Sequence, residues 1–217
     1  LKKSIAYSLA HLTPEVLPVL LWAFAGIPQP MGSLLALCVD LLTELVPSTS
    51  LAFEEPEALI MEVPPRNVKV DRLTRFPLLL YAYGIAGLAL TGACFYTYFR
   101  AFDFYGLSAK DLFSNDNKYF PSVNDDSYTT SDGRIYSPND QEYILRVIQG
   151  GWYLMIVVGQ ATHLMFCRTT TMSIFAHGFW KNATSNAGLV TAILLGCFVT
   201  YCPGLVDIVG SANPFSL

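Results

Sequence analysis

Long apolar stretches separated by polar segments dominate the hydrophobic pattern of this chain. Five windows approach or exceed the roughly 20 apolar residues that a helix needs to cross a bilayer. They cover residues 4–27, 31–53, 77–99, 150–167 and 183–202. The pattern therefore predicts an all-α membrane protein, a multispan bundle of about five transmembrane helices.

The first two windows are separated only by Pro28-Gln29-Pro30, which leaves room for a tight turn between antiparallel helices. We therefore predict a proline-rich helical hairpin over residues 1–53. The other predicted segments are a loop over 54–76, a helix over 77–99, a polar loop over 100–149, two helices with a short loop over 150–202, and a tail over 203–217.

Charge differs between the polar segments. The 54–76 segment carries four Lys or Arg side chains and the 168–182 segment carries two, whereas the 101–149 segment holds eight acidic residues against four basic ones. Short loops rich in Lys and Arg stay on the cytoplasmic side of a membrane. The sequence therefore predicts cytoplasmic 54–76 and 168–182 loops and an extracellular acidic loop.

Composition agrees with a membrane environment. Of the 217 residues, 53% are hydrophobic and 14% are charged, and the mean hydropathy is +0.41. A soluble domain usually has about a quarter of its residues charged. A net charge of −4, without a basic stripe interleaved with aromatic residues, excludes nucleic acid as the expected partner. The lipid bilayer is the expected surrounding.

Three carboxylates, Glu15, Asp40 and Glu44, lie within the predicted hairpin. A charge at mid-bilayer costs about 2.5 kcal/mol or more, so such residues usually face an interior cavity and serve ions or protons. Asp40 and Glu44 are four residues apart and share a helix face, where Thr43 adds a hydroxyl. Oxygen ligands of this kind suit sodium, potassium, calcium or hydronium.

Prolines accompany these acids at positions 14, 18 and 47. Proline removes an amide donor, which leaves carbonyl oxygens free to line a cavity or to bind an ion. The alternative is a pair of kinked structural helices whose acids are protonated and hydrogen-bonded to their neighbours.

Two histidines leave further alternatives open. His11 precedes Glu15 by four residues on the same helix face, so it is either a titratable cation of the site or a histidine satisfied within the bundle. Gln160 and His163, three residues apart, form a weaker polar pair. Hydrogen bonding between helices explains this pair at least as well as ion binding does.

Several motifs together resemble P-type cation-transporting ATPases of the sodium/potassium and proton/potassium pump group. The segments that carry the resemblance are Leu1-Lys2-Lys3-Ser4-Ile5-Ala6-Tyr7, Pro14-Glu15-Val16-Leu17-Pro18, Ile27-Pro28-Gln29-Pro30-Met31-Gly32, Leu37-Cys38-Val39-Asp40-Leu41-Leu42-Thr43-Glu44-Leu45-Val46-Pro47, Pro65-Arg66-Asn67 and Tyr201-Cys202-Pro203-Gly204. By this resemblance the five windows are transmembrane helices five to nine, and the chain ends before a tenth.

The resemblance implies that Glu15, Asp40 and Glu44 are the principal ligands for monovalent cations in an alternating-access cavity. His11 stands where the sodium/potassium pump has a serine and the gastric proton pump a lysine. The resemblance also implies ATP and Mg²⁺ in the full-length pump, N-terminal pump domains in the same chain, and a multi-pass position in the plasma membrane. A beta-type subunit would bind at the 101–149 loop, which keeps Asp126-Ser127-Tyr128.

No Asp-Lys-Thr-Gly-Thr phosphorylation motif and no phosphate-binding glycine loop occur in these residues, so this chain alone is not expected to hydrolyse ATP. One alternative is an ion channel or an ion-coupled secondary transporter that uses the same buried acids without ATP. Another is a membrane scaffold without transport, which would need no carboxylates inside the membrane.

Overall fold

The computed structural model describes residues 1–56, 72–113, 127–130, 133–169, 173, 178 and 180–214. Five helical segments in it are long and apolar enough to cross a membrane, which confirms the predicted fold class. These are Lys2–Ala25, Ser33–Phe53, Phe76–Phe104, Pro138–Cys167 and Ala183–Tyr201, of 24, 21, 29, 30 and 19 residues. Since a 20-residue helix is about 30 Å long, each segment is about as long as a bilayer core is thick, or longer.

The first segment is two helices, α1 (Lys2–Ala10) and α2 (Leu12–Ala25), with a break at His11. The break follows from Pro14, which cannot donate a hydrogen bond to the carbonyl of Ala10. α2 ends at Gly26, whose φ of 65° is the left-handed conformation that terminates many helices.

The predicted proline-rich turn is anchored from outside the hairpin. The hydroxyl of Tyr98 donates to the Pro28 carbonyl at 2.7 Å, and the side-chain amide of Gln149 donates to the Gln29 carbonyl at 3.1 Å. Prolines at positions 28 and 30 keep these residues out of a helix, so their carbonyls are available to side chains of other helices.

The second segment runs through α3 (Ser33–Cys38), the π-helical turn η1 (Val39–Thr43), α4 (Leu45–Ser50) and the 3₁₀ turn η2 (Leu51–Phe53). In η1 the Glu44 amide donates to the Val39 carbonyl five residues back, at 3.0 Å. Pro47 lacks the amide that would bond to the Thr43 carbonyl. A second π-helical turn, η4 (Leu80–Gly87), lies between α5 (Phe76–Leu79) and α6 (Leu88–Phe104).

The fourth long helix begins earlier than the apolar window indicates. α9 spans Pro138–Cys167, so the second part of the predicted 100–149 loop is helical. Ser137 caps its start, and Pro138 occupies the first turn, where a missing amide is harmless. Within the extension Ile144, Val147 and Ile148 are buried at helical spacing. The hydropathy window missed this part because only one of its faces is apolar.

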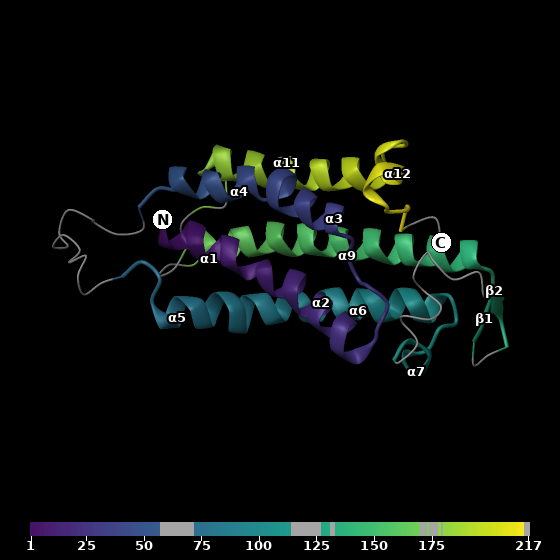
Figure 1. Cartoon of the computed structure of the whole chain (residues 1–217). Helices are drawn as coiled ribbons and strands as arrows, with labels where there is room; N and C mark the ends of the chain where they lie inside the picture. Colours follow the sequence, from purple (N-terminus) through teal and green to yellow (C-terminus); the bar gives the residue numbers. More distant parts are fainter. Residues whose placement is uncertain are drawn as a thin grey trace.

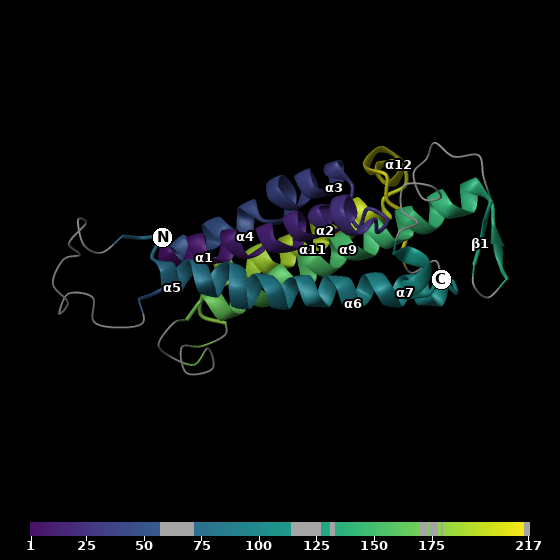
Figure 2. The ribbon, with the colours of Figure 1, turned by 60° about the horizontal axis from the view of Figure 1, so that its bottom comes forward.

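α9 is the central helix of the bundle. In its most apolar 18-residue stretch 61% of the residues are buried, against 22% to 39% in the other four segments. Figure 1 shows α9 between α6 on one side and α11 (Ala183–Tyr201) on the other. α1 packs against α9 and α2 packs against α6, and Figure 2 shows the same bundle from another side. Rings from α6 and α9 form an aromatic core, where Phe95 meets Trp152 edge to face at 4.9 Å.

Some short elements lie beside the bundle. A two-residue hairpin pairs β1 (Tyr128–Thr129) with β2 (Ile135–Tyr136), a small departure from the all-α prediction. The helices α7 (Ala109–Leu112) and α12 (Leu205–Val209) follow α6 and α11. Most of the predicted 54–76 loop, part of the 100–149 and 168–182 loops, Asp126 of the loop motif and residues 215–217 lie outside the described residues.

A buried polar network joins the ends of several helices. Arg168 is fully buried after the last residue of α9, and its guanidinium contacts both carboxylate oxygens of Glu54 at 3.1 and 3.3 Å. Asn182 donates to the same carboxylate at 2.7 Å, and Asn186 accepts from Arg168 at 3.2 Å. The Lys3 ammonium donates to the Arg168 carbonyl at 2.6 Å. These five residues, the Arg168 network, therefore connect α1, the end of the hairpin, α9 and α11.

Candidate cation site

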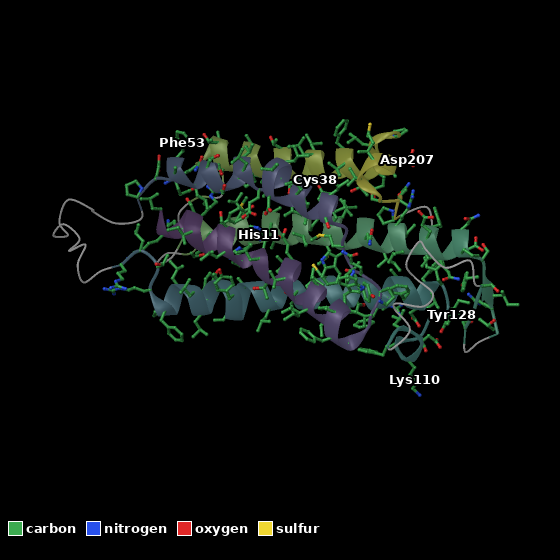
Figure 3. All side chains as sticks on the ribbon, in the orientation of Figure 1. His11, Cys38, Phe53, Lys110, Tyr128 and Asp207 are labelled. Carbon is green, nitrogen blue, oxygen red and sulfur yellow. The ribbon has the colours of Figure 1, made fainter. Side chains whose placement is uncertain are left out.

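The carboxylates predicted from sequence meet around the ring of His11. Nε2 of His11 lies 3.0 Å from Asp40 Oδ1 and 3.9 Å from Glu15 Oε2. Nδ1 on the other side of the ring contacts Glu44 Oε2. Figure 3 shows His11 inside the bundle. The hairpin therefore brings together all three acids and the histidine, which we call the His11 cluster.

Broken helices position these four side chains. His11 lies at the break between α1 and α2, and Glu15 is in the first turn of α2. Asp40 lies in the π-helical turn η1, and Glu44 ends that turn. The breaks follow from Pro14 and the π-helical hydrogen bonding, so the residues that interrupt the helices also place the acids.

Burial divides the cluster into an interior and an edge. The side chains of His11, Glu15 and Glu44 are 7%, 11% and 6% exposed, whereas that of Asp40 is 48% exposed. Oε1 of Glu15 is buried and has no hydrogen-bond partner among the described residues. Buried carboxylate oxygens normally have partners, so an unpartnered one is suited to an ion or to water.

A cation could be held between the acids. One ligand atom each from His11, Glu15 and Asp40 lies within 4.8 Å of the others. Carboxylate oxygens at this separation fit a hard cation. Both ring nitrogens of His11 face carboxylate oxygens, an arrangement that suits two N–H donors, and only the imidazolium has two. The cluster can thus hold either an external cation or the charge of its own histidine.

The other two predicted ligands are less directly involved. Thr43 is buried, and its hydroxyl donates a hydrogen bond to the Val39 carbonyl in η1 at 3.0 Å. The hydroxyl proton is therefore already engaged within the helix. Gln160 is buried on α9, and neither polar atom of its side chain has a hydrogen-bond partner in the described part of the chain. The structure therefore does not join Gln160 to the His11 cluster by any hydrogen bond.

His163 belongs to a different group from the one that sequence spacing indicated. Its Nε2 lies 3.4 Å from the Tyr81 hydroxyl and 3.3 Å from the Cys167 thiol, and its ring stacks on Tyr7 at 5.9 Å. Sequence reasoning paired His163 with Gln160 and missed this aromatic and thiol group. The spacing of four between His163 and Cys167 was the available signal, because such residues share a helix face.

Comparison with known proteins bears on the same region. Residues 28–217 match the family described as "Cation transporting ATPase, C-terminus". The chain belongs to this family. It is 38% identical over 205 residues to the sodium/potassium-transporting ATPase subunit alpha of Drosophila melanogaster, and 37% identical over 211 residues to subunit alpha-1 of Anguilla anguilla. Each match covers 94% of this chain and 20% of the relative, so the chain spans about a fifth of the length of these proteins.

The chain thus contains the C-terminal membrane region of a cation-transporting ATPase, and over this region it is similar to sodium/potassium-transporting alpha subunits. Its five apolar helices and the resemblance seen in the sequence agree with this assignment. The matched family region includes Asp40 and Glu44, and it begins after His11 and Glu15.

Proposed function

We propose that this chain is the cation-binding and translocation part of an ATP-driven pump for monovalent cations, namely sodium, potassium or protons. The observation that carries the proposal is the His11 cluster, three acids gathered inside a hairpin of broken helices. Membership of the cation ATPase family supports it, as do relatives whose names include sodium and potassium transport. Buried acids of this kind are costly to keep unless they serve ions.

Each residue of the cluster has a distinct role in this proposal. Glu15 and Glu44 supply interior oxygens, and Asp40, at the more exposed edge, meets the entering cation first. His11 competes with the cation for the same oxygens. Transport follows when two states of the hairpin, inside-open and outside-open, bind the cation with different affinity. ATP, together with Mg²⁺, phosphorylates a part of the protein outside these residues. This phosphorylation shifts the population between the two states.

Orientation and partners are part of the proposal. Figure 3 places Phe53 at one end of the bundle and Lys110 and Tyr128 at the other. The short 54–76 and 168–182 segments at the Phe53 end carry six Lys and Arg side chains, whereas the longer 101–149 segment carries four and is acidic overall. By the positive-inside rule the Phe53 end therefore faces the cytoplasm and the other end faces outward. The protein is a multi-pass component of the plasma membrane, and a beta-type subunit contacts the acidic 101–149 segment.

Cation-dependent ATP hydrolysis tests the proposed function. The full-length protein in liposomes is expected to hydrolyse ATP faster with sodium or potassium than with choline at equal ionic strength, and to move the activating cation. Turnover is measured across sodium, potassium and pH. Cation flux that proceeds without ATP would instead assign a channel or a secondary transporter. ATP turnover that is independent of sodium, potassium and pH would contradict the proposed pump.

A second prediction concerns His11, whose ring contacts three carboxylates. If the imidazolium occupies part of their negative charge, lowering the pH weakens potassium binding. If potassium binding displaces one proton, the apparent potassium affinity changes by at most about tenfold per pH unit. We expect the pH dependence of apparent potassium affinity, measured between about pH 6 and pH 8, to be shallower in His11→Ser than in the wild type.

His11→Lys is the matched control, because lysine keeps the positive charge throughout this pH range. Its potassium affinity should be low and nearly independent of pH. Protonation of Glu15, Asp40 and Glu44 alone would give the same direction without the histidine. Parallel curves for the wild type and His11→Ser would therefore assign the effect to the acids and remove His11 from it.

A further inference from the structure

A group of sulfur, nitrogen and oxygen atoms lies apart from the carboxylates of the His11 cluster. Nε2 of His163 lies 3.3 Å from Sγ of Cys167 and 3.4 Å from the hydroxyl oxygen of Tyr81. His163 and Cys167 are four residues apart and share a face of α9, whereas Tyr81 comes from the π-helical turn η4. We call these three residues the thiol–imidazole group.

Hydrogen bonding inside this group is incomplete. The Tyr81 hydroxyl and the Cys167 thiol are both donors and both lie at Nε2 of His163, so the proton of the neutral ring is on Nδ1. One imidazole nitrogen has a single lone pair, which cannot accept from both donors with good geometry. His163 and Cys167 are only 8% and 5% exposed, and the buried Nδ1 has no hydrogen-bond partner among the described residues.

The spacing of the group suits a metal ion. Metal–sulfur and metal–nitrogen bonds of about 2.3 and 2.0 Å, at an angle of about 110–120°, hold the sulfur and the nitrogen about 3.5–3.7 Å apart. The separation of Sγ and Nε2, 3.3 Å, is only slightly shorter, so a small rotation of either side chain admits the ion. A cavity of about 410 Å³ is lined by Tyr81 and His163 and provides a way in.

We propose that the thiol–imidazole group binds a soft monovalent metal cation, Cu(I), through Sγ of Cys167 and Nε2 of His163, with the Tyr81 oxygen as a weaker third ligand. On binding, the thiol gives up its proton to solvent and a sulfur–copper bond takes its place. The Nε2 lone pair then faces the ion in place of two competing donors. Thiolate and imidazole select soft or borderline metals, whereas the carboxylates of the His11 cluster select hard ones.

Charge favours a monovalent ion over Zn²⁺. A thiolate and Cu(I) are neutral together, whereas a thiolate and Zn²⁺ leave one uncompensated positive charge inside the bundle. The ammonium of Lys3 bonds to the carbonyl of Arg168, the residue after Cys167, at 2.6 Å and makes a further positive charge more costly. Zn²⁺ also prefers four ligands, more than these three residues supply.

A bound ion would restrain helices that the proposed transport cycle moves. It joins α9 to η4, and the His163 ring that it fixes stacks on Tyr7 of α1, the helix that leads directly to His11. Occupation of the thiol–imidazole group is therefore expected to slow the pump. The binding itself is independent of transport, so it can be measured without ATP.

Copper binding to the full-length protein tests the proposal. Free Cu(I) is fixed with a competing chelator under anaerobic conditions, and the copper bound per protein is counted. Cys167→Ala should bind one ion fewer than the wild type. The matched control is Cys94→Ala, because Cys94 is an equally buried thiol that packs in the aromatic core, and this variant should bind as many ions as the wild type does.

The imidazole contact has its own test. His163→Phe keeps an aromatic ring against Tyr7 and should weaken Cu(I) binding by about tenfold or more. X-ray absorption at the copper edge, with too little copper to fill more than the tightest site, should show sulfur and imidazole nitrogen neighbours in the wild type. Zn²⁺ at the same free concentration should leave Cu(I) binding unchanged. The thermal midpoint of each variant shows whether it is folded.

Three results would overturn the proposal. The first is an equal number of bound ions in Cys167→Ala and Cys94→Ala, and the second is a copper environment of sulfur alone in the wild type. The third is displacement of Cu(I) by Zn²⁺ at equal free concentration, which would contradict the selection by charge. If Cys167→Ala does not fold, the affinity of His163→Phe decides. None of these results bears on cation-stimulated ATP hydrolysis, so failure here is distinct from failure of the proposed function.

Discussion

Arg168→Met or Glu54→Gln, each alone, is expected to lower the free energy of unfolding by about 3–5 kcal/mol, the usual cost of leaving one member of a buried ion pair uncompensated. Both side chains are almost fully buried, at 0% and 3% exposure, so water cannot replace the lost partner. Denaturant unfolding in mixed micelles measures the change.

The control for this prediction is the exposed pair of Arg100 and Asp103, which is joined at 2.6 Å. Arg100→Met should cost no more than about 1 kcal/mol, because water screens an exposed pair. The double variant Arg168→Met with Glu54→Leu should recover much of the loss, since it leaves no buried charge unpaired. Similar losses for Arg100→Met and Arg168→Met would contradict the assigned importance of the Arg168 network.

Replacing Glu15 or Glu44 with Gln, or Asp40 with Asn, should reduce the cation affinity of the full-length pump tenfold or more, about 1.4 kcal/mol each. Each change removes a charged oxygen from the ring around His11 and keeps the size of the side chain. The measurement is the concentration of sodium or potassium that half-activates ATP turnover.

Asp207→Asn is the matched control, since it removes an exposed acid that lies well away from His11 in Figure 3. It should leave cation activation unchanged. Wild-type activation in all three cluster variants would show that the cluster is not the transport site. The interior acids Glu15 and Glu44 should have larger effects than Asp40, because Asp40 is about half exposed and water can partly replace it.

The sequence predicted the spans and the acids for a clear physical reason. Apolar windows arise because polar groups are excluded from lipid. An acid within such a window is energetically costly, so Glu15, Asp40 and Glu44 could be identified as candidate site residues from the sequence alone. The prolines beside the acids likewise predicted an opened helix, and the structure breaks the first helix at His11, three residues before Pro14.

Other features depend on contacts between distant segments and were not predictable in this way. The start of α9 at Pro138 is determined by the Ser137 cap and by one buried apolar face. A hydropathy average over all faces of the helix hides that apolar face. The π-helical turn η1 has no simple sequence signature. Arg168 looked like a loop cation, and only the packing of Glu54, Asn182 and Asn186 around it shows that it is buried.

The extra residue held in η1 gives the hairpin a way to exchange ligands by rotation. If the π-helical turn shifted along the helix, each step would replace one hydrogen bond of the π type by one of the α type, so the number of backbone hydrogen bonds would stay the same. When the π-helical turn shifts past a residue, the side chain of that residue rotates by about 100° around the helix axis, the angle of one residue at 3.6 residues per turn. Asp40 or Glu44 would then leave His11, while Glu54 stays fixed by Arg168. A screw motion of one residue could thus change which oxygens face the cation, without any helix sliding across the bilayer.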